Sequence, residues 1–144
     1  MLAQAEQLSP DLRDHVLRDV ADGLGAAIDY ALELRLAEIS AAVRAIAAKL
    51  RSRLTEIAGV RVHDKGAERC GIVSFTLAGA RPGEIAEALA SRPINVIVAP
   101  TFCTPLDLPA RGLTDGVVRA SVHYYDTIEE VEQFCSAVSS LRAP

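Results

Sequence analysis

The chain has 144 residues and a formal net charge of −4; half of its residues are apolar, only 4% are aromatic, and tryptophan is absent. A chain of this length can bury a hydrophobic core, which we expect to consist mainly of Ala, Leu, Val and Ile. The acidic balance gives no electrostatic reason to expect binding to nucleic acid or to an anionic membrane.

The first residues lack the basic and apolar regions of a signal peptide, and no apolar run approaches the roughly 20 residues that span a bilayer. Three cysteines, Cys70, Cys103 and Cys135, form an odd set at wide spacings. This pattern argues against a disulfide framework and against a zinc site, and it suits a reducing compartment. We therefore expect a cytoplasmic protein that binds neither nucleic acid nor a membrane.

Helical patterns occupy the first part of the chain. Ser9 is expected to cap a helix over residues 10–21, with proline in its first position. Gly23 and Gly25 weaken this pattern, which then resumes over residues 26–36.

A long amphipathic helix is predicted to follow and to end at Gly59. Its apolar residues recur at steps of three or four, namely Leu36, Ile39, Val43, Ile46, Leu50, Leu54 and Ile57. Basic residues crowd its C-terminal half, where the helix dipole favours them as a solvated face; they are Arg44, Lys49, Arg51 and Arg53. The chain is thus expected to divide into an N-terminal helical segment, residues 1–35, and a second domain, residues 36–144.

From here onward the apolar period changes from that of a helix to that of strands. Residues 60–63 are expected to form a short strand, and residues 71–77 alternate as a half-buried strand does. The side of the second strand that faces the core is predicted to carry Val73, Phe75 and Leu77.

A further helix is expected to begin with Pro82 in its first position and to direct Ile85 and Leu89 inward. Residues 95–99 are apolar on both faces of a third strand, so we expect both faces to be covered. Residues 117–122 form the fourth strand. The predicted fold class is α+β, with N-terminal helices followed by a small, mainly antiparallel sheet that helices cover.

The third and fourth strands are joined by a segment, residues 100–116, that contains three prolines and two glycines. This length is unusual in a compact domain and is typical of a functional loop or of a mobile one.

The fourth strand carries a single arginine. Alternation places Val118, Ala120 and Val122 on one face, so that Arg119 and Ser121 point to the other. A guanidinium on a rigid strand is a fixed fork for a carboxylate. The alternative is an ordinary surface arginine on an edge strand.

A helix start follows this strand directly. Thr127 and Glu130 stand at capping-box spacing before an amphipathic run over residues 128–141. The strand and the helix start together form a motif over residues 118–127.

This motif resembles the end of the small C-terminal domain of the class V aminotransferases. These fold-type I enzymes use pyridoxal phosphate (PLP) and include cysteine desulfurases and isopenicillin-N-epimerase-like proteins. The resemblance continues through residues 59–64 and 68–75 and, less specifically, residues 23–30. It covers roughly residues 22–142 and implies the small-domain fold of the PLP transferases.

The resemblance also implies roles for particular residues. In that family the arginine that matches Arg119 binds the α-carboxylate of the substrate. Ser121 and His123 share its face by alternation and would form the polar rim of a small pocket, although a structural, hydrogen-bonded imidazole is the alternative for His123. The loop of residues 100–116 would close over the substrate.

A large domain precedes the small domain in that family and supplies the lysine that binds PLP. This chain has two lysines: Lys49 lies among helical charges, and Lys65 lies in a predicted turn. Neither lies in a setting where desolvation would lower the pKa of the amine so that it could form a Schiff base. We therefore expect no PLP binding by this chain alone, and we expect a large PLP-binding domain as a partner and an amino acid as substrate in the whole enzyme.

In cysteine desulfurases the corresponding loop presents a nucleophilic cysteine. Cys103 lies two residues before Pro105, whereas those enzymes resemble Cys-Ala-x-Pro-Leu, in which the spacing is three. One residue moves a side chain by about 3 Å along an extended chain. Because no Lys or His neighbours Cys103 to activate its thiol, a catalytic cysteine and a simple loop thiol both stay open.

The remaining candidates are expected to have structural roles. His15 and His63 have no second ligand at metal spacing, so no metal site is predicted. Cys70 and Cys135 are expected to lie in the core as small hydrophobes.

Three functions remain open. The chain is expected to be the small domain of a class V aminotransferase-like enzyme, as a fragment or a separately encoded piece that is catalytically incomplete alone. The alternatives are a stand-alone small-molecule-binding or protein-interaction module and a thiol or sulfur carrier that uses Cys103. Apolar surface on the N-terminal helices predicts a homo-oligomer formed through them.

Overall fold

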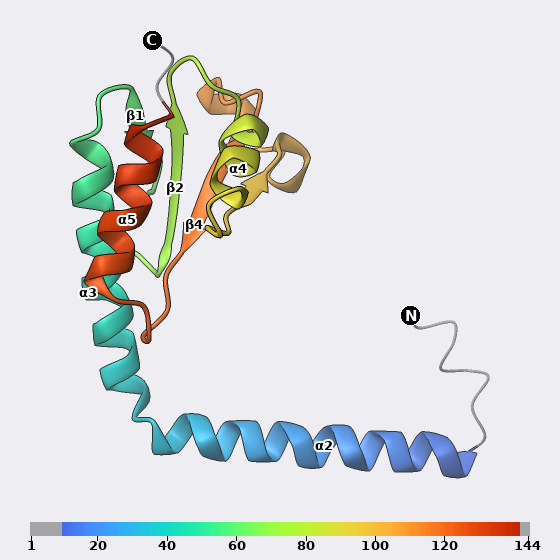
Figure 1. The fold of residues 1–144 in the computed structure, drawn as a ribbon. Helices are drawn as coiled ribbons and strands as arrows, with labels where there is room; N and C mark the ends of the chain where they lie inside the picture. The colour runs from blue at the N-terminus through green and yellow to red at the C-terminus, as the bar shows by residue number, and fades with distance from the viewer. Residues whose placement is uncertain (1–9, 142–144) are drawn as a thin grey trace. The chain divides into compact units, whose positions relative to one another are not determined.

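The computed structural model describes residues 10–141 (Figure 1). Its elements in chain order are the helices and strands α2 (Pro10–Glu33), α3 (Leu36–Thr55), β1 (Val60–Val62), β2 (Ile72–Leu77), α4 (Pro82–Ala90), β3 (Ile97–Ala99), the 3₁₀ turns η1 (Thr101–Cys103) and η2 (Pro109–Arg111), β4 (Val117–Ser121) and α5 (Ile128–Ser139). The predicted α+β class is therefore confirmed. None of the helices in this part of the chain has a stretch that is long and apolar enough to cross a membrane.

The chain forms two compact units, of which the first ends at Ile39 and the second begins at Ser40. The first unit contains α2, which runs without interruption through Gly23 and Gly25. The expected end of a first helix near residue 21 is therefore wrong, because a glycine in a helix costs only about 1 kcal/mol relative to alanine and the neighbouring residues favour the helix. The expected cap at Ser9 lies outside the described residues.

The second unit is built on a four-stranded sheet with the order β1-β2-β4-β3, in which all neighbouring strands are antiparallel. One face of this sheet is apolar because alternate residues of the central strands point to it. The predicted inward set on β2 is confirmed, since Val73, Phe75 and Leu77 are all buried.

Three helices cover this apolar face, and α3 and α5 lie side by side on it (Figure 1). Arg53 of α3 donates hydrogen bonds to both carboxylate oxygens of Glu132 of α5, at 2.9 and 2.8 Å from Nε. The residues that the helices and strands contribute to the core include Leu50, Leu54, Phe75, Ile85, Leu89, Val118, Val131 and Val138.

The start of α5 has the predicted capping box. The backbone nitrogen of Glu130 donates to Thr127 Oγ1 at 3.2 Å, and the backbone nitrogen of Thr127 donates to Glu130 Oε2 at 2.7 Å. Because these bonds satisfy amide groups that the helix itself leaves free, they fix where α5 begins.

The third strand differs from its prediction. β3 is an edge strand paired only with β4, and the Ile97 side chain is 61% exposed. The expectation that both faces are covered is wrong at Ile97, where the face opposite the helices is open, although Ala99 of the same strand is buried.

The opposite face of the sheet carries a second, small apolar cluster. Val117 points away from the helices and is buried with Ala99 and Leu108, and Leu113 packs against them. Leu108 and Leu113 belong to the predicted loop of residues 100–116, which therefore lies on this face.

Gly116 joins this loop to β4 with a positive φ of 84°, and a Cβ atom there would lie 2.4 Å from the carbonyl oxygen of Ala99. We predict that Gly116→Ala lowers the free energy of unfolding by about 2 kcal/mol or more, because both the backbone and the contact are strained. Urea denaturation measures the change. The matched control is Gly83→Ala in α4, where a Cβ meets nothing within 4 Å; it is expected to be neutral or slightly stabilising. Equal effects of the two substitutions would contradict the strain argument.

Candidate functional site

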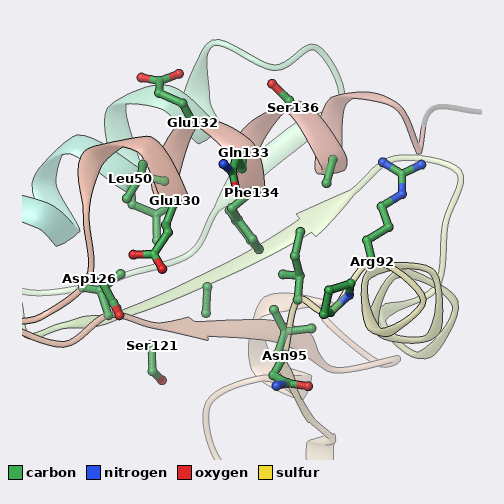
Figure 2. Close-up of a pocket in the computed structure, with 17 residues that line it drawn as sticks. Leu50, Arg92, Asn95, Ser121, Asp126, Glu130, Glu132, Gln133, Phe134 and Ser136 are labelled. Carbon is green, nitrogen blue, oxygen red and sulfur yellow. The ribbon is translucent and has the colours of Figure 1, made fainter.

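Among the cavities of the described part of the second unit, two are lined by residues of β4, the strand that carries Arg119. The larger has a volume of about 840 Å³ and lies between α5 and the segment of residues 92–96, above β4 (Figure 2). The smaller has a volume of about 490 Å³ and lies on the face of the sheet opposite the helices.

The charged side chains that line the larger cavity already serve the fold. Figure 2 shows Asp126 and Glu130 at one end and Arg92 at the other. Glu130 caps α5, the Asp126 carboxylate accepts a hydrogen bond from the backbone nitrogen of His123 at 2.7 Å, and Arg92 donates to Ser140 Oγ at 2.6 Å. The larger volume therefore does not make this cavity the better candidate.

The smaller cavity contains Arg119, whose side chain has no internal partner among the described residues, and we call it the Arg119 cavity. It is lined by Ser74 and Arg119 of the sheet, by residues of the 63–72 segment, and by Cys103, Asp107 and Arg111 of the loop. It thus brings together two residues that the sequence singled out, Arg119 and Cys103.

Arg119 is half-buried, and its side chain has no hydrogen bond or ion pair within residues 10–141. Its cross-strand neighbours are Ser74 on β2 and Ile97 on β3, neither of which carries a charge. A guanidinium in this setting keeps its donors free for an external acceptor, and a carboxylate matches its two-pronged geometry.

A buried ion pair forms one wall of the Arg119 cavity. Arg51 Nε donates to Asp64 Oδ2 at 2.6 Å, and the two side chains are 10% and 8% exposed. Arg51 Nη2 also donates to the carbonyl oxygens of Cys70 and Ile72 at 2.7 and 3.0 Å, and the backbone nitrogen of Ser74 donates to Asp64 Oδ1 at 2.8 Å.

The predicted solvated face of α3 is therefore wrong for Arg51. It is also wrong in part for Arg53, which is half-buried and paired with Glu132. Both arginines have partners far away in sequence, and a helical spacing pattern carries no information about such partners.

The loop is attached to this wall by a second set of ion pairs. Lys65 pairs with Asp107 Oδ1, and Arg111 Nη1 donates to Asp107 Oδ2 at 3.0 Å. The hydrogen bond from Lys65, followed by that from Arg111, lowers the pKa of the Asp107 carboxyl. Arg111 Nη2 also donates to the carbonyl oxygen of His63 at 2.8 Å.

His63 is buried at the end of β1, with its Nε2 atom 2.8 Å from Thr76 Oγ1. Burial is the main cause of a lowered pKa for its imidazole, and the charges of Arg111 and Arg61 act in the same direction. A neutral His63 therefore serves as a fixed part of the wall. Within residues 10–141 no three potential metal ligands are gathered into one group.

Ser121 and His123 lie apart from the Arg119 cavity. Ser121 lines the larger cavity, and His123 is exposed and stacks on Tyr125 with a ring-centroid distance of 4.3 Å. Figure 2 shows the Ser121 side chain on the side of β4 that faces away from α5, and the polar rim expected of Ser121 and His123 stays a prediction. β4 ends at Ser121, so the alternation used to place His123 no longer holds there.

The three cysteines differ in exposure. Cys135 is buried as predicted, and burial raises the pKa of its thiol to about 11. Cys70 is exposed, so its predicted place in the core is wrong; only its backbone is engaged, by Arg51. Cys103 is exposed in η1, at the Arg119 cavity.

Sequence reasoning missed Asp64, Asp107 and Arg111 as parts of the site. Asp107 and Arg111 pair with one another four residues apart, but their other partners, and both partners of Asp64, are 10 to 48 residues away. The one available signal was the length of the 100–116 loop, which needs attachments to lie flat on a sheet.

Comparison with known proteins agrees with this fold. Residues 20–134 match the profile of the class V aminotransferases, so the chain belongs to this PLP-dependent family. A probable cysteine desulfurase of Mycolicibacterium paratuberculosis is 35% identical over 122 residues, which are 83% of this chain and 18% of that protein. A cysteine desulfurase of Synechococcus elongatus is 30% identical over 126 residues, which are 86% of this chain and 20% of that protein.

Among solved structures, the apo cysteine desulfurase of Thermococcus onnurineus NA1 superposes with a TM-score of 0.76 and 29% identity. The match covers 83% of this chain and 30% of that one. The chain thus spans about a fifth of the length of the curated relatives named above.

The two lysines do not fit the covalent attachment of PLP. Lys49 Nζ lies 3.7 Å from a carboxylate oxygen of Glu132 and its side chain is 43% exposed; the Lys65 side chain is 62% exposed and paired with Asp107. A lysine that forms a Schiff base needs an amine whose pKa is lowered by desolvation or by neighbouring cations. Both lysines are substantially exposed and have carboxylate partners, so neither stands in a desolvated or cation-rich setting of this kind.

Proposed function

We propose that this chain is the substrate-binding small domain of a PLP-dependent enzyme of the class V aminotransferase family. Arg119 holds the α-carboxylate of an amino-acid substrate, and a large domain, on the same or another polypeptide, supplies PLP and its lysine. The observation that carries the proposal is a guanidinium on a central strand that has no partner within residues 10–141 and lies at the wall of a cavity that a long loop covers.

The energy of one such contact limits what the chain does alone. A charge-assisted fork contributes on the order of 1.5–3 kcal/mol, and this corresponds to binding in the millimolar range or weaker. Arg119 therefore orients a substrate that other groups must bind more tightly, and the chain is catalytically incomplete by itself.

The loop of residues 100–116 is proposed to close the site. Phe102 and Leu106 on this loop are 80% and 92% exposed. Large apolar side chains this exposed are costly in water and favourable against a second surface. Such a surface is expected where the large domain meets the bound substrate, so the loop would exclude water from the reacting atoms.

Sulfur chemistry is the reaction favoured by the names of the relatives, and a thiol or sulfur carrier is the second candidate function. Cys103 supports it because its thiol is exposed and shares the cavity with Arg119. The free state of all three cysteines in the structure also fits a reducing cytoplasm. A stand-alone binding module would use the same carboxylate site without any reaction.

The first test replaces the proposed anchor. Arg119→Ala is expected to abolish the backbone amide shifts that millimolar L-alanine causes in residues around the Arg119 cavity, because the fork for its carboxylate is lost. Nuclear magnetic resonance titration measures these shifts. The matched control is Arg61→Ala, which removes an exposed strand arginine outside the cavity and should respond as the wild type does. Equal responses of the Arg119 variant and the wild type would refute the proposed function.

The second test concerns the cofactor. Incubation of the chain with PLP, borohydride reduction and digestion should give only weak, scattered labelling of Lys49 and Lys65, because neither amine is activated. Peptide mass spectrometry locates the label. Stoichiometric label on one lysine would contradict the need for a separate PLP-binding domain.

We also propose that the chain self-associates through its N-terminal helices. The exposed apolar side chains of α2 recur along one broad stripe and include Leu12, Val16, Val20, Leu24 and Ile28. Exposed apolar surface of this extent favours association.

Light scattering is therefore expected to give the mass of a dimer or higher oligomer, and Val20→Asp should lower it by placing a charge in the stripe. Asp22→Asn, which changes a neighbouring polar position of the same helix, is the control and should leave the mass unchanged. A monomer over a wide concentration range would rule this association out.

A further inference from the structure

The loop of residues 100–116 is held on the sheet by a small apolar cluster and by a group of polar contacts. The most buried loop residue of the apolar cluster is Leu108, which is 4% exposed and packs with Ala99 and Val117. It lies beside the Arg119 cavity, which Leu108 also lines. The position of the loop therefore decides the shape of the space around Arg119.

The polar contacts are centred on Asp107. Its two carboxylate oxygens accept from Lys65 and Arg111, and Arg111 continues to the backbone carbonyl of His63. Lys65 and His63 belong to the segment that follows β1, 42 and 48 residues from their partners. Asp107 thus connects the loop to a different part of the sheet.

The carboxylate also keeps two cations together. Lys65 and Arg111 each bond to Asp107, so without its negative charge they would face one another as like charges. Repulsion would then move Lys65 or the loop, and Arg111 would retain only its bond to His63. The loop would keep its Leu108 contact but lose a fixed position over the cavity.

We propose that Asp107 is a positioning residue, which holds the 100–116 loop over Arg119 and thereby sets the affinity of the cavity for a carboxylate. This inference rests on the function proposed above for Arg119. Asp107 itself touches no ligand in this account and acts through the loop.

Removal of the Asp107 charge changes the affinity for a carboxylate in opposite directions for a positioning role and for a purely electrostatic role. Asp107 is an anion at the edge of the cavity, so its removal by itself makes the cavity more positive and should strengthen carboxylate binding. A positioning role predicts the opposite, weaker binding, because the loop no longer encloses the ligand.

The experiment compares Asp107→Asn with Glu68→Gln in the full chain. Glu68 lines the same cavity and carries the same charge, but it makes no contact with the loop among the hydrogen bonds and ion pairs of residues 10–141. L-alanine is the titrant, backbone amide shifts give the affinity, and amide hydrogen exchange of residues 101–113 reports how firmly the loop is held. Unchanged shifts in α5 show that the variants are folded.

Asp107→Asn is expected to weaken L-alanine binding several-fold and to speed exchange in the loop, whereas Glu68→Gln should do neither. Binding by Asp107→Asn that is unchanged or tighter, or loop exchange equal to that of the wild type, would overturn the proposal. Lys65→Gln removes the other charge of the Lys65–Asp107 ion pair and should speed amide hydrogen exchange in the loop as well. If the wild type shows no Arg119-dependent binding, the proposed function fails, and the exchange data still decide whether Asp107 holds the loop.

Discussion

The ion pair between Arg51 and Asp64 connects the parts of the molecule from which the candidate site is built. Arg51 extends from α3 to the carbonyl oxygens of Cys70 and Ile72, and Asp64 accepts from the backbone of Ser74 on β2. Ser74 is in turn the cross-strand neighbour of Arg119. Breaking a buried pair by removing one partner costs about 3–5 kcal/mol, which is a large part of the total stability of a domain. The Arg119 cavity therefore depends on a contact that reaches it from the helical side.

The two faces of the sheet have different roles: one packs against the helices, and the other lies under the loop of residues 100–116. Val118 and Ala120 point into the core with the helices, whereas Val117 and Arg119 point to the loop. The apolar face supplies most of the buried surface, so the other face can carry an unpaired cation without loss of the fold. Under the proposed function, this is the face that would meet the substrate in a longer enzyme.

The regular elements of the second unit could be predicted because each has one buried face. The alternation of Val73, Phe75 and Leu77, and the capping box of Thr127 and Glu130, are local patterns with local physical causes. The attachments of the site are different in kind, since all of them except the pair of Asp107 and Arg111 join residues that are distant in sequence.

Helical spacing places Arg51 on a solvated face, because the spacing carries no information about its distant partner Asp64. Lys65 likewise lies in a predicted turn, and nothing near it in sequence indicates its pairing with Asp107. Arg119 is singled out by family resemblance rather than by spacing, and His123 lies beyond the end of β4, where alternation no longer places a side chain. The exposure of Cys70 could not be predicted either, because the residues next to it in sequence do not indicate that its side chain faces water.

The central claim is that Arg119 holds a carboxylate in the cavity beneath the loop. A crystal structure of the chain grown with L-alanine tests it most directly. The account predicts the ligand carboxylate within hydrogen-bonding distance of the Arg119 guanidinium, with the loop held by Asp107 above it. An Arg119 that instead pairs with Glu68 or Asp107, in a cavity without ligand, would contradict it.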